Sequence, residues 1–113
     1  QAKVGNTIYD ISKAMQTVVE SSGYSVIRDL TGHGIGRELH EDPFIPCYAD
    51  PKYKSIPIKV GQALAIEVMY TMGSHRLKLE ADGWTISTLD GSLSSMHEET
   101  VFITPDGPAI LTL

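Results

Sequence analysis

The apolar residues near the start of the chain recur at steps of three and four, which is the spacing of one face of an amphipathic helix. They are Ile8, Ile11, Met15, Val18 and Val19. Thr7 stands three residues ahead of Asp10 and is suited to cap the helix start, while Gly23 is suited to end the helix. The pattern predicts a helix over about residues 6–22 that packs one face against the rest of the protein.

After this helix the pattern changes to short extended segments. A strand is predicted over Tyr24–Asp29, and a glycine-rich turn is predicted to follow at Gly32–Gly36. The four prolines from Glu41 to Pro57 predict a loop that crosses the surface. Ala63–Tyr70 is mostly apolar on both faces, as expected of a central strand.

The last third of the chain is predicted to form two hairpins. Their reversals are marked by Asp82-Gly83 and by Pro105–Pro108, in which the residue types favour turns. The four strands are expected at Arg76–Glu80, Trp84–Thr88, Thr100–Thr104 and Ala109–Leu113.

The element pattern and the length together indicate one small domain. The chain has 113 residues, of which 42% are hydrophobic and 20% charged, and this length suits a single core. One or two helices with a mainly antiparallel sheet predict an α+β fold, as a single domain over residues 1–113. No apolar run approaches the roughly 18 residues of a membrane span, so we expect no membrane partner.

Charge and cysteine content limit the binding partners and the cellular compartment expected for the protein. The net charge of −5 argues against a nucleic-acid partner, which would need a basic patch. Cys47 is the only cysteine, which excludes an internal disulfide and favours a reducing compartment, here the cytoplasm. Because the chain starts at Gln1 rather than at Met, we expect a fragment of a longer protein.

Three side chains are candidates for chemistry. Glu67 lies inside the most apolar predicted strand, where a carboxylate is costly to bury unless a cation or strong donors meet it. His33 lies between glycines, and Glu98 is expected to open the strand at Thr100–Thr104. An imidazole and two carboxylates suit a divalent metal such as Zn, Mn, Fe or Co. A structural histidine, an ion pair and a solvated acidic step explain the same residues, so spacing alone leaves the metal site open.

A resemblance to a known family adds to this picture. Gly32–Gly36 and His40–Pro43 resemble the G-H-G-I-G-x-x-x-H-E-x-P signature of the methionine aminopeptidases. The similarity continues in order through Ile66-Glu67, Asp82–Thr85 and Glu98. The Asp-Gly-Trp-Thr element favours the methionine enzymes over prolidase-like relatives, and the absence of a large insertion after the second histidine favours type I. The resemblance implies the C-terminal half of a catalytic domain with the pita-bread fold.

The resemblance also implies an activity and a metal centre. Enzymes of this family remove the initiator methionine from the N-terminus of nascent polypeptides with two divalent metal ions, here Co, Mn, Fe or Zn. His33, Glu67 and Glu98 match three of the family's metal ligands, with Glu98 matching the carboxylate that bridges both ions. Glu67 further matches the residue with the general acid–base role.

Three more residues match positions that contact the substrate in the family. His40 matches the histidine that hydrogen-bonds the substrate carbonyl and the oxyanion that develops from it. Leu39 and Trp84 match positions that line the pocket for the methionine side chain. An apolar and partly aromatic pocket suits a thioether.

The match is incomplete, which leaves a second function open. Two aspartate ligands and one substrate-facing histidine of the family belong to an N-terminal half that this sequence lacks, so we expect negligible activity without that half as a partner. Val68 and Glu99 also replace a usual proline and histidine. The alternative is a non-catalytic pita-bread module that binds peptides or proteins and self-associates through its open sheet.

Overall fold

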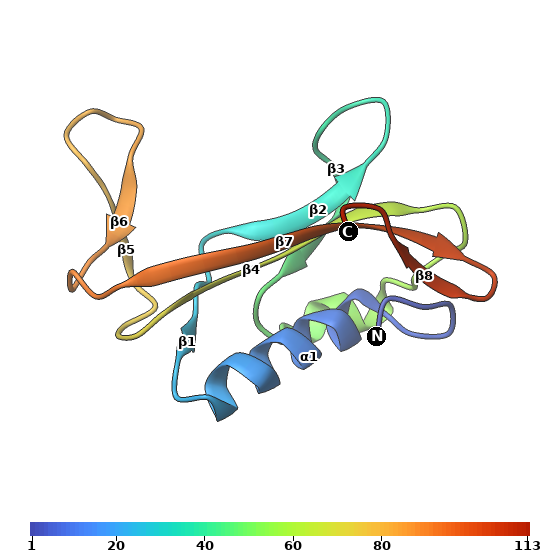
Figure 1. The fold of residues 1–113 in the computed structure, drawn as a ribbon, viewed down its shortest axis with the longest axis horizontal. Coiled ribbons are helices and arrows are strands. Elements are labelled where there is room, and N and C mark those ends of the chain that lie inside the picture. Colours follow the sequence, from blue (N-terminus) through green and yellow to red (C-terminus); the bar gives the residue numbers. More distant parts are fainter.

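A helix covers one face of an antiparallel sheet, and two hairpins project from the other face (Figure 1). The computed structural model describes all residues from Gln1 to Leu113. Its elements are α1 (Ile8–Ser21), β1 (Ser25–Val26), β2 (Thr31–Ile35), β3 (Glu41–Pro46), the 3-10 helix η1 (Pro51–Ser55), β4 (Ala63–Thr71), β5 (Leu77–Leu79), β6 (Ile86–Thr88), β7 (Ser94–Thr104) and β8 (Gly107–Ile110). Neither helix combines the length and the apolar composition that a membrane-spanning helix requires.

The helix forms where the apolar spacing predicts it. The Asp10 carboxylate accepts hydrogen bonds from the backbone N–H and the hydroxyl of Thr7, at 2.8 and 2.9 Å, and thereby fixes the first turn. Val18 departs from the prediction, because it lies at the margin of the apolar stripe and is 67% exposed. The face that packs against the sheet is lined by Ile8, Ile11, Met15 and Val19.

The central strand is β4, as its two apolar faces predict. The main sheet has the order β3-β2-β4-β7-β8, and the short strand β1 pairs with the far end of β4. β4 and β7 pair along their whole common length, from Ala63 opposite Phe102 to Thr71 opposite Ser94. This pairing places side chains of β4 and β7 next to one another in a fixed order.

The predicted turn at Gly32–Gly36 is wrong, because most of this segment forms β2. Its glycines allow β2 to pack closely against the neighbouring strands, and they do not form a chain reversal. A Cβ on Gly32 would overlap the backbone oxygen of Ala65 in β4, and a Cβ on Gly34 would overlap the backbone oxygen of Asp42. Only glycine lets β2 lie this close to both neighbours.

The predicted loop from Glu41 to Pro57 is also wrong in part. β3 occupies Glu41–Pro46, and η1 occupies Pro51–Ser55. β3 tolerates Pro43 and Pro46 because it is an edge strand that pairs only with β2. The proline that begins η1 stands in its first turn, where a missing N–H costs no hydrogen bond.

The remaining strands differ from the prediction mainly in length. The hairpin β5–β6 forms where Asp82-Gly83 predicts it, but β1 is only two residues long. β7 begins at Ser94 and not near Thr100, so Glu98 lies inside a strand and does not open one. The residues at the start of β7 are mostly polar, so the pattern of hydrophobic residues does not predict a strand there.

Most of the core lies between α1 and the sheet, and its buried apolar residues form two neighbouring clusters. The larger cluster joins the first half of α1 to the middle of the sheet, and its members are Ala2, Ile8, Ile11, Ile45, Ile58, Leu64, Val101 and Ile103. The smaller cluster joins the end of α1 to β1 and β4, and its members are Val19, Val26, Ile27, Cys47 and Met69. Met69 joins the smaller cluster from the face of β4 opposite to that of Leu64.

Candidate metal centre

Three adjacent strands bring the predicted metal ligands together. His33 comes from β2, Glu67 from β4 and Glu98 from β7, and the two glutamates are direct partners in the strand register. One ligand atom of each residue lies within 4.8 Å of the others. Leu64 packs toward α1, and because side chains alternate along a strand, Glu67 points to the opposite face.

The backbone orients His33 for this cluster. Its ring is buried, and Nδ1 lies 2.9 Å from the carbonyl oxygen of Gly34. A carbonyl oxygen can only accept, so Nδ1 carries the hydrogen and Nε2 keeps its lone pair. Nε2 lies 3.7 Å from Oε1 of Glu67, which places the free lone pair beside the carboxylates. This is the arrangement that commonly fixes a metal-binding imidazole.

The two carboxylates repel each other in the absence of a cation. Burial raises the pKa of the Glu67 carboxyl above its ordinary value, and the charge of Glu98 raises it further. The imidazoles of His33 and His40 lower the same pKa by smaller amounts. One imidazole nitrogen and two carboxylates that face each other are a donor set that suits a divalent cation, so these residues fit a metal.

His40 also lies at this cluster. It belongs to the exposed segment between β2 and β3, and its ring lies 4.3 Å from the ring of His33, centre to centre, with a tilt of 59°. The exposed position leaves His40 free to meet a molecule that approaches the carboxylates from the solvent.

The structure does not bring Leu39 and Trp84 into a common pocket. Leu39 lies in the segment between β2 and β3 and is 68% exposed, and Trp84 lies at the tip of the β5–β6 hairpin and is 87% exposed. The hollow that Trp84 lines is formed only by Gly83–Ile86 of its own hairpin. The segment between β2 and β3 and the β5–β6 hairpin both extend on the face of the sheet away from α1 (Figure 1). Their predicted role in substrate binding stays a prediction.

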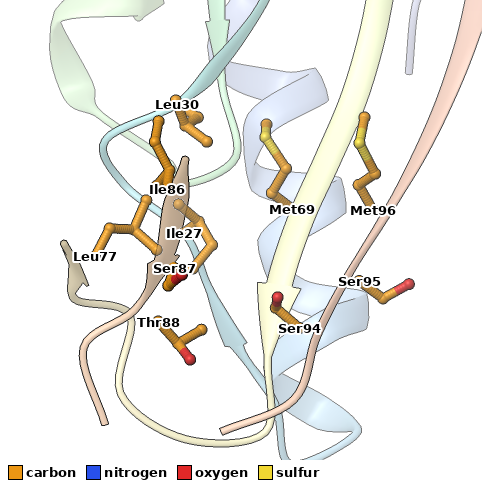
Figure 2. Close-up of a pocket in the computed structure, with 10 residues that line it drawn as sticks. All are labelled: Ile27, Leu30, Met69, Leu77, Ile86, Ser87, Thr88, Ser94, Ser95 and Met96. Carbon is orange, nitrogen blue, oxygen red and sulfur yellow. The ribbon is translucent and has the colours of Figure 1, made fainter. Parts of the chain in front are cut away.

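An apolar cavity that the sequence did not reveal lies on the same face. Met69 and Met96 are register partners two residues beyond Glu67 and Glu98, so they lie beside the carboxylates on that face. Figure 2 shows both side chains together with residues of β6 and of the segment before β2. The cavity measures about 320 Å³, and its apolar lining consists of Ile27, Leu30, Met69, Leu77, Ile86 and Met96. Alternation along the predicted central strand places Met69 on the face of Glu67, but the other lining residues come together only in the assembled fold.

Glu99 does not join the acidic pair, although it follows Glu98 directly. It points to the other face of the sheet, where its Oε1 lies 3.1 Å from Nε2 of His97 and its Oε2 accepts a hydrogen bond from the hydroxyl of Thr112. The unusual glutamate at this position therefore adds its charge away from the cluster.

The fold and the cluster together define an α+β protein with a candidate divalent-metal centre on one face of its sheet. The family model described as metallopeptidase family M24 matches residues 1–105, and the chain belongs to this family. Curated relatives include the methionine aminopeptidases of Clostridium perfringens, 50% identical over 100% of this chain, and of Bacillus subtilis, 46% identical over 99%.

Solved structures agree with this assignment. The methionine aminopeptidase of Thermotoga maritima has a TM-score of 0.91 and 47% identity and covers 97% of this chain, and that of Rickettsia prowazekii has a TM-score of 0.90 and 39% identity and covers 98%. The predicted pita-bread fold is thereby confirmed. The chain spans 45% of each of the two curated relatives, and 44% and 45% of the two solved chains.

Proposed function

We propose that these residues are the C-terminal half of the catalytic domain of a type I methionine aminopeptidase, which removes the N-terminal methionine from nascent polypeptides. The convergence of His33, Glu67 and Glu98 carries the proposal, because these residues are the ones that the family signature assigns to the metal. A free buried thiol at Cys47 fits the cytoplasm, where nascent chains emerge.

In this proposal Nε2 of His33 and the carboxylates of Glu67 and Glu98 would be ligands of two divalent ions. Co, Mn, Fe and Zn all suit this donor set. When bound, such a pair of ions polarises the scissile carbonyl and lowers the pKa of a water molecule. The remaining ligands would come from the half of the fold that these residues do not include.

The proton steps belong to Glu67 and His40. Glu67 lies at the centre of the cluster, opposite Glu98 and beside His33, where a carboxylate can reach a water molecule held by the ligands. Glu67 would accept a proton from the attacking water and pass it to the leaving amine. A ring N–H of His40 would donate to the carbonyl oxygen of the substrate as negative charge develops there.

The substrate would lie across the face of the sheet that carries the carboxylates. The exposed side chains of Leu39 and Trp84 would contact the methionine together with the absent half, since exposed apolar groups gain from being covered. The cavity beside Met69 and Met96 offers space for the peptide next to the scissile bond.

A complementation assay tests this proposal. Release of methionine from a Met-Ala-Ser peptide is measured with Co²⁺ for the 113-residue chain alone and for the chain mixed with the N-terminal part of the Clostridium perfringens relative. We expect no turnover by the chain alone, turnover by the mixture, and none by a mixture that carries Glu67→Gln. Turnover by the chain alone, or an assembled but inactive mixture, would overturn the proposal. Cleavage of an Ala-Pro peptide in preference would point to prolidase chemistry.

A second candidate function is self-association as a binding module. It is supported by the open edge of β7, because β8 pairs only with Val101–Thr104 and leaves Ser94–Glu99 with one neighbour, β4. Met72, Leu93 and Leu111 are exposed as well. Unpaired strand edges with apolar neighbours favour pairing with another chain.

A further inference from the structure

The sheet has a gap beside Glu67. β2 pairs with β4 only from Ala63 to Ala65, and β1 pairs with β4 only at Tyr70 and Thr71. The stretch Ile66–Val68 has no register partner on this side, and the pairing resumes at Met69, whose carbonyl oxygen accepts a hydrogen bond from the backbone N–H of Ile27 at 2.8 Å. Around Glu67 the central strand therefore has regular pairing only with β7, and its other edge is left without ladder hydrogen bonds.

The thiol of Cys47 fills this gap. It lies just beyond the end of β3 and is 0% exposed. Its Sγ accepts a hydrogen bond from the backbone N–H of Met69 at 3.4 Å and lies 3.6 Å from the carbonyl oxygen of Glu67. The carbonyl oxygen of Leu30 is more distant, at 3.9 Å. Because a thiol has one hydrogen, it donates to the nearer Glu67 carbonyl while it accepts from Met69.

We propose that Cys47 is a positioning residue for Glu67. Its thiol supplies one donor and one acceptor to β4, as a peptide group of a neighbouring strand would, and so holds the backbone that directly follows the Cα of Glu67. The backbone sets the direction of the Cα–Cβ bond, which aims the carboxylate toward Nε2 of His33 and toward Glu98.

The need for such a support follows from the electrostatics of the cluster. Glu67 faces Glu98 directly across the β4–β7 register, and the two like charges push Glu67 away from its position. A long and flexible side chain on a strand that is paired on one edge only would move away from Glu98. The role of Cys47 as a ligand support rests on the proposed function, whereas its hold on the backbone of β4 does not.

A simpler role for Cys47 is to fill space in the core. It packs in the same cluster as Val19, Val26 and Met69, and a filler would act through its volume alone. The two roles predict different results for substitutions that change volume and hydrogen bonding separately. Cys47→Ala removes both the donor and the acceptor, whereas Cys47→Ser keeps both. Val26→Ala removes volume from the same cluster and leaves the thiol in place.

Two measurements on the 113-residue chain test the proposal. The first is the affinity for Co²⁺, followed by visible absorption. The second is the χ1 rotamer distribution of Glu67 in the metal-free chain, obtained from three-bond NMR couplings. We expect Cys47→Ala to weaken Co²⁺ binding by about tenfold, which is typical when a group behind a ligand is removed, and to average the Glu67 rotamers. Cys47→Ser is expected to keep a single rotamer and most of the affinity.

The control variants separate the possible failures. A single Glu67 rotamer in Cys47→Ala would overturn the proposal, as would equal rotamer averaging in Val26→Ala. If the parent chain binds Co²⁺ no better than Glu67→Gln does, the metal centre of the proposed function fails. The rotamer measurement then still decides whether Cys47 holds Glu67 in place.

Discussion

Glu67 carries its charge in a setting that disfavours charge. The carboxylate is largely buried and faces Glu98, and both features raise its pKa. A carboxyl whose pKa is higher in the folded chain than in the unfolded one lowers stability as the pH rises through its ordinary value. Below that value the group is protonated in both states and has no effect. The acidic pair thus destabilises the metal-free fold at neutral pH.

We therefore expect Glu67→Gln to raise the free energy of unfolding of the metal-free chain near neutral pH. The gain should shrink as the pH falls below the ordinary carboxyl pKa of about 4.3, because both chains are then uncharged at this position. Urea unfolding in the presence of a chelator, at about pH 7 and about pH 3, measures this difference. Glu20→Gln on the exposed side of α1 is the control. A gain that is the same at both pH values would contradict the assigned cause.

The absence of a side chain at Gly32 allows β2, which carries His33, to lie close to β4, which carries Glu67. A methyl group at this position would overlap the backbone oxygen of Ala65 and press on the strand that carries Glu67. We expect Gly32→Ala to lower the free energy of unfolding by about 1–3 kcal/mol, as overpacking in a core does. Urea unfolding at neutral pH checks the value. Ser95→Ala, at an exposed position of β7, should stay within about 0.5 kcal/mol of the parent.

At the scale of elements, those that depend on residues within one segment were predicted correctly, and those that depend on pairing between strands were not. α1 and the β5–β6 hairpin followed from the apolar period and from Asp82-Gly83, because both signals act within one element. β3 and the first half of β7 did not follow, because proline at an edge and polar residues in a strand depend on the neighbouring strands. The start of β7 reads as polar because one face carries Glu98 and the other carries His97 and Glu99.

The residues of the candidate site likewise fall into those that the sequence indicated and those that depend on strand pairing. The motif around His33 and the carboxylate in the most apolar strand were visible in the sequence, and the family resemblance supplied their roles. The position of Glu98 opposite Glu67 depends on the β4–β7 register, which the sequence did not reveal. The thiol of Cys47 at a gap between two strands leaves no trace in any residue pattern, because the gap exists only in the assembled sheet.

The start of α1 gives a prediction at this scale. The backbone N–H and the hydroxyl of Thr7 hold the pKa of the Asp10 carboxyl below its ordinary value. A lowered pKa means that the interaction stabilises the fold above the ordinary value, and that this contribution is lost as the pH falls through the lowered one. Asp10→Asn should therefore be less stable than the parent near neutral pH.

Thermal unfolding followed by far-UV circular dichroism, from about pH 7 down to about pH 2, measures this effect. The two chains should converge at the acidic end, where Asp10 is protonated. Glu38→Gln, outside α1, should show no such convergence. An equal difference at every pH would instead indicate that the substitution disturbs the helix through packing.

At the scale of the whole molecule, the chain is a sheet with one covered face and one open edge. α1 covers part of one face, while β7 from Ser94 to Glu99 has a neighbour on one side only. Leu93 before this stretch, Met96 within it and Leu111 after β8 are all more than half exposed. Such a surface is typical of a unit that is completed by further chain.

We expect the isolated chain to dimerise as its concentration rises, because two open edges can pair about a twofold axis. Sedimentation velocity over a hundredfold concentration range measures this association. Ser95→Lys places a charge on the open edge and should shift the chain toward monomer. Lys13→Ser, on the outer side of α1, is the control. A parent chain that stays monomeric throughout would count against the self-associating module.

The direct pairing of Glu67 with Glu98 has one more consequence, which concerns errors in assembly. Side chains alternate along a strand, so a slip of β7 by one residue against β4 would turn Glu98 to the wrong side. The same slip would turn Val101 out of the core beneath it. A molecule with the slipped register would therefore lose the burial of Val101 together with the pairing of Glu98 and Glu67. The hydrophobic core thus selects the register that brings the two carboxylates together.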